Sequence, residues 1–131
     1  MVKYSLEERK ERARQLHKQG YNCSQCVVMA FDDINGLSEE LAARIASGFG
    51  GGVGGQRQVC GAVSGMTILE GVTYPGSPTE KPAIYSAVKS DSEKFKAING
   101  SIVCGDLLKP GRKPCIELIE DAIRIIDSKL R

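Results

Sequence analysis

The chain has 131 residues and a net charge of +2, with 41% hydrophobic and 26% charged residues. This composition predicts one globular domain over residues 1–131 and excludes disordered and collagen-like chains. No apolar run approaches the roughly 18 residues of a membrane-spanning helix, and the first residues contain no apolar signal segment, so we expect a cytoplasmic protein without membrane insertion. The small charge and the few aromatic side chains (three Phe, four Tyr) argue against a nucleic-acid partner.

Three helix start signals lie in the first third of the chain. A capping box at Ser5 predicts a charged helix that stops at Gly20 and, because it has few apolar positions, lies on the surface. Asn22 caps a second, apolar helix that we expect to continue to about Asn35. Ser38 begins a third helix.

Glycine and proline divide the rest of the chain. A tract with six glycines over residues 48–55 precedes a helix of small and apolar residues that ends at Gly71. Helical spacing predicts a long helix over residues 84–98, with Asp91 as its one polar slip, and a last helix after Pro114. No alternating strand pattern of useful length occurs. The sequence therefore predicts an all-α fold, a compact single-domain helical bundle with a glycine-rich loop before its central helix.

The most informative residues are five cysteines, Cys23, Cys26, Cys60, Cys104 and Cys115. An odd number of cysteines in a chain without an export signal favours metal binding or reversible thiol chemistry over structural disulfides. The alternative is that they are small buried hydrophobes, which we favour for Cys26 because it lies on an apolar helical stretch. Cys23 stands at the start of its helix, where free backbone N–H groups and the helix dipole favour the thiolate, so we expect it to be the most reactive thiol.

Other groups give weaker signals. The one histidine, His17, lies on a charged helix and is expected to be solvated, which leaves no support for a Cys–His nucleophile. The glycine tract formally contains G-x-G-x-x-G, but no strand precedes it, so a dinucleotide-binding loop is not predicted. We expect Gly50, Gly51 and Gly52, with Gly61 in the next helix, to form the walls of the cysteine site.

Gly61 and Gly65 lie one helical turn apart in the predicted central helix. Small residues at this spacing allow another helix to pack closely, and they also make a homodimer possible. We expect valine at either position to overpack this contact and to destabilise the fold.

Together these markers resemble a family of small redox-active proteins named after the cysteine pattern C…CGAxxG…C…C. The matching residues are Asn22-Cys23-Ser24-Gln25, Gly48-Phe49-Gly50-Gly51-Gly52, Cys60-Gly61-Ala62-Val63-Ser64-Gly65, Cys104 and Cys115. The resemblance implies a helical bundle with an electron-transfer or thiol-redox role, in which these four cysteines act as a set and Cys26 stands outside it. Genes of the family are often seen near transporter genes, which implies a redox partner linked to a transport system.

The sequence leaves three functions open. In the first, Cys23, Cys60, Cys104 and Cys115 converge on a redox site that either holds an iron–sulfur cluster or cycles between dithiol and disulfide. In the second, the same cysteines form a structural four-cysteine zinc site in an interaction module, although only Cys23 and Cys26 have zinc-finger spacing. In the third, the cysteines belong to the core and the protein only binds a transport system.

Overall fold

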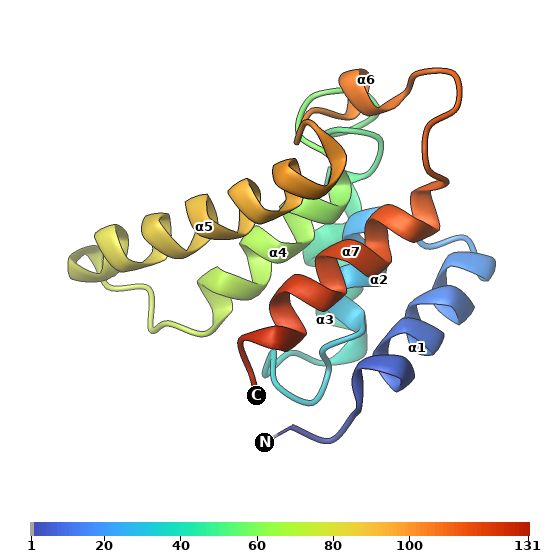
Figure 1. Cartoon of the computed structure of the whole chain (residues 1–131). Coiled ribbons are helices and arrows are strands. Elements are labelled where there is room, and N and C mark those ends of the chain that lie inside the picture. The colour runs from blue at the N-terminus through green and yellow to red at the C-terminus, as the bar shows by residue number, and fades with distance from the viewer. Residues whose placement is uncertain (1) are drawn as a thin grey trace.

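The structure is a computed structural model that describes residues 2–131, and these residues form seven α-helices and two short 3-10 helices (Figure 1). The α-helices are α1 Leu6–Lys18, α2 Cys23–Met29, α3 Glu39–Ala46, α4 Gly61–Val72, α5 Lys81–Asn99, α6 Cys104–Leu107 and α7 Cys115–Ser128. The 3-10 helices are η1 Ser47–Phe49 and η2 Pro78–Glu80. Within the described chain the only β pairing is one isolated antiparallel bridge between Val59 and Val103. The predicted all-α class is confirmed.

Helix α2 is the centre of the bundle. It lies behind α7 in Figure 1, and it packs against α1, α3, α4 and α7. Its residues 26–29 are fully or almost fully buried, as expected of a helix that is apolar on all sides. Helix α5 lies across α4 and extends beyond the body of the molecule (Figure 1). No helix formed by residues 2–131 combines the length and the apolar character that a membrane span requires.

The helix starts follow the predicted capping signals. Ser5 and Asn22 each accept a hydrogen bond from the backbone of the third helical residue, whose side chain reaches back to the cap. Helix α2, however, ends at Met29, earlier than the expected end near Asn35. Three side chains bind the backbone carbonyl oxygens at this end. Asn35 Nδ2 donates to the carbonyl of Val28, Arg12 Nε to that of Met29, and Arg9 Nη1 to that of Ala30. These side-chain bonds stabilise an early helix end.

Helix α1 is not only a surface helix, contrary to the expectation from its few apolar positions. Its Arg9 is fully buried between α2 and α7. The guanidinium forms two hydrogen bonds to Asp33, of 2.6 and 2.8 Å, and one to Asp127, of 3.2 Å. It also lies 4.4 Å from the ring centre of Phe31. A buried charge requires such partners, and these contacts fix α1 on the bundle.

The glycines of α4 bring it into close contact with α2. A methyl group at Gly65 would lie 2.7 Å from Cβ of Val27, and one at Gly61 would lie 3.1 Å from Cβ of Cys23. The close helix contact anticipated for these two glycines therefore forms within the chain. Because α2 covers this face of α4, the face is not available to a second copy of the protein.

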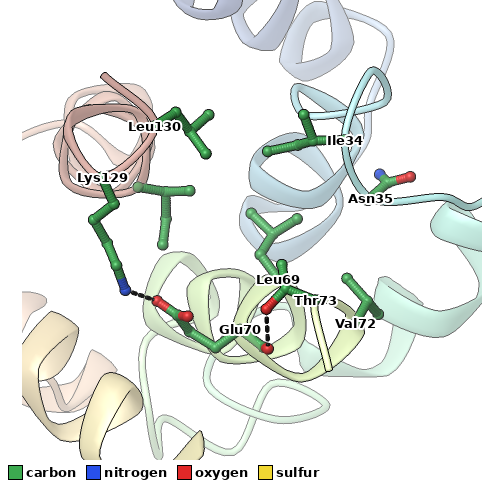
Figure 2. Close-up of a pocket in the computed structure, with 9 residues that line it drawn as sticks. Ile34, Asn35, Leu69, Glu70, Val72, Thr73, Lys129 and Leu130 are labelled. Carbon is green, nitrogen blue, oxygen red and sulfur yellow. Dashed lines mark hydrogen bonds and ion pairs between the residues drawn. The ribbon is translucent and has the colours of Figure 1, made fainter. Parts of the chain in front are cut away.

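A cavity of about 180 Å³ lies at the end of α4 and α7 that is remote from the cysteines (Figure 2). Figure 2 shows Lys129, the C-cap residue of α7, reaching Glu70 of α4 at its wall. Lys129 Nζ also lies 3.3 Å from Oδ1 of Asp91 on α5, a residue that is only 1% exposed. Burial, and then the neighbouring Glu70, raise the pKa of Asp91 to about 7, although Lys129 acts in the opposite direction. Asp91, the polar residue in the apolar face of α5, is thus part of a buried charged cluster that joins α4, α5 and the end of α7.

Valine at Gly65 should destabilise the protein by about 1–3 kcal/mol, because its branches would overlap Val27 of α2. Gly71 is the matched control, since it lies in the same helix and no atom comes within 4 Å of a methyl group placed there. Urea denaturation of both variants measures the difference. Equal stability of Gly65→Val and Gly71→Val would contradict close packing at Gly65.

Asp91→Asn should raise the melting temperature at pH 8 more than at pH 4. In the wild type the unfolded Asp91 carboxyl ionises near its ordinary value of 3.8, while the folded one keeps its proton to about 7. Its contribution to stability is therefore present below 3.8 and is lost as the pH rises towards 7. Circular dichroism melts across this range provide the measurement, with Ser90→Ala on the exposed side of α5 as control. An Asn variant whose melting temperature falls with pH as steeply as that of the wild type would refute this linkage.

Candidate functional site

The backbone brings Cys60 and Cys104 together. The segment before α4 runs antiparallel to the segment before α6, and the isolated bridge joins them. The Cys60 N–H donates to the carbonyl of Ile102 at 2.7 Å, and the Cys104 N–H donates to that of Gln58 at 2.6 Å. Cys60 is the N-cap residue of α4 and Cys104 is the first residue of α6. Two cysteines that are 44 positions apart, 60 and 104, therefore lie on paired segments.

The glycine tract folds back on itself to deliver one of these segments. Gly51, Gly52, Gly54 and Gly55 all have φ between +60° and +77°, the left-handed region that favours glycine. A methyl group at Gly52 would lie 2.5 Å from the backbone nitrogen of Gln58, so the loop is closed by contacts that only glycine allows. The loop thereby sets the position of the segment that pairs with the one leading to Cys104.

The four glycines predicted as walls of the site lie in different surroundings. A methyl group at Gly61 would meet Cys23, and one at Gly50 would meet the side chain of Asn22 at 2.7 Å. Gly51 and Gly52 pack mainly against the backbone of their own loop. Gly61 and Gly50 therefore adjoin Cys23 and its cap, while Gly51 and Gly52 shape the loop. That these glycines hold a cofactor stays a prediction.

Cys23 and Cys115 meet at the starts of α2 and α7. Interaction with the Cys23 thiol is the main cause that lowers the pKa of Cys115 to about 5, and Arg112, whose Nη1 lies 3.6 Å from Cys115 Sγ, lowers it further. The same contact, together with burial, raises the pKa of Cys23. Within the pair these effects favour the negative charge on Cys115 and the neutral thiol at Cys23. The premise that the helix start lowers the pKa of Cys23 is contradicted, because contact with Cys115 and burial raise it. That Cys23 is the most reactive thiol is therefore not supported by its surroundings, which favour Cys115 instead.

Cys60, which the backbone pairs with Cys104, also interacts with Cys115 of the other pair. Burial raises the pKa of its thiol, the backbone N–H groups of Ala62 and Val63 act against this rise, and the charges of Cys104 and Cys115 add to it. Cys23 is in turn affected by the charge of Cys60. These interactions place the four cysteines of the motif within electrostatic range of one another. Their role as redox thiols or metal ligands stays a prediction.

Cys26 lies outside this group. It is fully buried, its Sγ donates to the Tyr21 carbonyl at 3.6 Å, and burial raises its pKa to about 12. The interpretation of Cys26 as a core residue is confirmed.

The site also contains two arginines that the sequence analysis did not identify. Arg112 contacts Cys115, and Arg57 Nη1 lies 3.9 Å from Cys104 Sγ. Arg112 stands three residues before Cys115, and Arg57 stands three residues before Cys60. Neither arginine lies in a helix, so helical periodicity does not predict their contacts with the sulfurs. His17 is exposed, as predicted, and its charge also lowers the pKa of Cys115, although less than Arg112 does.

The donor set has the chemistry of a zinc or iron–sulfur site, since four thiolates are the ligands that these centres prefer. Its geometry does not fit one as it stands. Within residues 2–131, no three or more His, Cys, Asp and Glu side chains are grouped closely enough to hold a metal ion. A centre with four cysteine ligands therefore requires the sulfurs to move from these positions.

Comparison with known proteins supplies a family and a relative. Residues 21–129 match the model of a family described as "Putative redox-active protein (C_GCAxxG_C_C)". The chain is also 28% identical to a protein of Archaeoglobus fulgidus named "Uncharacterized protein", over an alignment of 144 positions that covers 95% of each chain. No solved structure matches the chain. The matched region contains all four motif cysteines.

Iodoacetamide should alkylate Cys115 before Cys23 in the reduced protein, with a rate that rises around pH 5. Arg112→Gln should shift this midpoint to higher pH, because it removes the cation 3.6 Å from the sulfur. Lys113→Gln is the matched control, since Lys113 pairs with Asp121 at 2.8 Å. Mass spectrometry of digests resolves the two sites. Faster modification of Cys23 than of Cys115 would reverse the assignment.

Proposed function

Because the chain belongs to the four-cysteine redox-active family whose model it matches, we propose that it is a thiol–disulfide redox protein. Cys115 and Cys23 are its reacting pair, and Cys60 and Cys104 form a second pair beside them. The protein exchanges electrons with a partner that carries a disulfide, in the cytoplasm, where thiols are kept reduced.

One observation carries the proposal, namely that Cys115 and Cys23 interact while only Cys115 has a cation on its sulfur. Thiol–disulfide exchange is favoured by this difference within a pair. The attacking sulfur reacts as the thiolate, and a resolving thiol of higher pKa leaves the first attack to its neighbour. The partly exposed Cys115 suits the first role, and the neutral Cys23 beside it suits the second.

The oxidation of the protein proceeds in two successive thiol–disulfide exchanges. The Cys115 thiolate attacks one sulfur of the partner disulfide, whose S–S bond breaks, and one partner thiolate leaves. Cys23 gives up its proton to this thiolate and attacks Cys115 Sγ, so that the mixed disulfide breaks and the second partner thiolate leaves and takes a proton from water. The protein loses two electrons to form the Cys23–Cys115 disulfide, and the partner disulfide is reduced to two thiols. The reverse sequence reduces the protein.

An iron–sulfur cluster on the four cysteines is the second candidate. It is favoured by the chemistry of the donor set and by the charges of Cys104 and Cys115, which both act on Cys60. The four sulfurs would have to move closer together than they lie here to hold the cluster. In this candidate the four sulfurs would be the ligands, and the bound cluster would supply one-electron transfer. The alternative of a structural zinc site uses the same four ligands.

Oxidation of the reduced protein with a small disulfide tests the proposal. We expect a Cys23–Cys115 disulfide in peptide maps, loss of this product in Cys23→Ser and Cys115→Ser, and its retention in Cys26→Ala, the matched buried control. Iron, sulfide and zinc are measured in parallel on protein purified without oxygen. Stoichiometric iron and sulfide would support the cluster instead, and a colourless protein with about one tightly held zinc would support the structural site.

A further inference from the structure

The two arginines at the cysteines differ from the other arginines of the chain. Within residues 2–131, neither Arg57 nor Arg112 forms an ion pair with a carboxylate, and both contact a site sulfur instead. All the remaining arginines are ion-paired: Arg9, Arg12, Arg14, Arg44, Arg124 and Arg131. The positive charge of these two arginines therefore faces the sulfurs of the site and not a carboxylate.

A cleft opens beside Arg112. It has a volume of about 270 Å³ and lies between the end of α5, α6 and the loop from α6 to α7. This loop contributes Lys109, Arg112 and Lys113 to the lining. Lys113 is neutralised by Asp121, and Lys109 forms no ion pair within the described chain. The cleft therefore presents two cations that have no carboxylate partner within residues 2–131, Lys109 and Arg112, and the second of them also contacts the Cys115 sulfur.

The remaining lining limits what the cleft accepts. Its one acidic residue, Asp106, accepts a hydrogen bond from Ser101 Oγ at 2.9 Å. Apolar side chains line other parts of it, among them Ile98, which is 48% exposed, and Leu118. The volume lies near the lower limit of roughly 300–1,000 Å³ for small-molecule sites. A short apolar chain that ends in an anion fits these features, whereas an ammonium group would meet the two cations.

We propose that this cleft receives the carboxylate arm of an anionic low-molecular-weight disulfide, which is the oxidant that Cys115 attacks. Arg112 links the two places, since the same guanidinium lines the cleft and lies 3.6 Å from the attacking sulfur. The inference rests on the proposed thiol–disulfide function and specifies its substrate class. The exchange is the one described above, with the two halves of the small disulfide leaving as carboxylated thiols.

Three small disulfides of similar size test the charge preference. They are dithiodipropionate, which is anionic, hydroxyethyl disulfide, which is neutral, and cystamine, which is cationic. The rate of Cys23–Cys115 disulfide formation with each probe is divided by the rate of the same probe with mercaptoethanol, which removes intrinsic differences in leaving group. At low salt we expect the normalised rate to be at least about tenfold higher for the anionic than for the cationic probe, and the ratio to fall as salt is added.

Lys109→Gln isolates the cleft from the reacting sulfur, because Lys109 lines the cleft and makes no hydrogen bond to a site sulfur within residues 2–131. It should lower the normalised rate of the anionic probe severalfold and leave that of hydroxyethyl disulfide unchanged. Lys89→Gln, which removes an exposed lysine of α5 outside the cleft, is the matched control and should change neither.

The outcomes separate this inference from the function on which it rests. Equal normalised rates for the three probes, or an anionic rate that is the same in Lys109→Gln as in the wild type, would overturn the substrate class and leave the dithiol function in place. Absence of the Cys23–Cys115 disulfide with every probe would overturn the function, and the inference with it.

Discussion

The contact of α4 with α2 through Gly61 and Gly65 is the constraint on which the rest of the structure depends. It buries the most apolar segment of the chain, and at Gly61 it also meets Cys23, a residue of the candidate site. Core packing and site geometry are therefore set by the same atoms. A side chain at Gly61 would displace the start of α2 from the start of α4, and with it Cys23 from Cys60.

All four motif cysteines lie where a helix begins, because Cys23, Cys104 and Cys115 are the first residues of α2, α6 and α7 and Cys60 is the N-cap of α4. Helix N-termini present free N–H groups and the positive end of the helix dipole, which favour negative charge on sulfur. Cys104 reaches the other three through the bridged segments that the glycine loop positions. Backbone N–H groups of Ala62 and Val63 act on the Cys60 sulfur, and the two guanidinium groups that contact Cys104 and Cys115 come from loops.

Local signals predicted much of this arrangement, because they depend on neighbours in sequence. The capping side chains of Ser5 and Asn22 act within one helical turn, and the cysteine motif specified which thiols form a set. The early end of α2 was not predictable in this way, since its carbonyls are bound by side chains of α1 that are distant in sequence. The position of Asp91 in the apolar face of α5 was not predictable either, because its partner Lys129, which also pairs with Glu70, is distant in sequence.

The assignment of the reactive thiol illustrates the same limit. Cys23 and Cys115 are both the first residue of a helix, so the helix dipole stabilises either thiolate and does not predict which thiol has the lower pKa. The mutual contact of the two thiols and Arg112 together make the difference. Arg112 stands in the loop between α6 and α7, contacts Cys115 Sγ, and acts on Cys23 only through its charge. This loop also supplies Lys109 to the cleft. In the proposed function, reactivity and charge selectivity therefore come from two positions of one short segment, Arg112 beside the sulfur and Lys109 in the cleft.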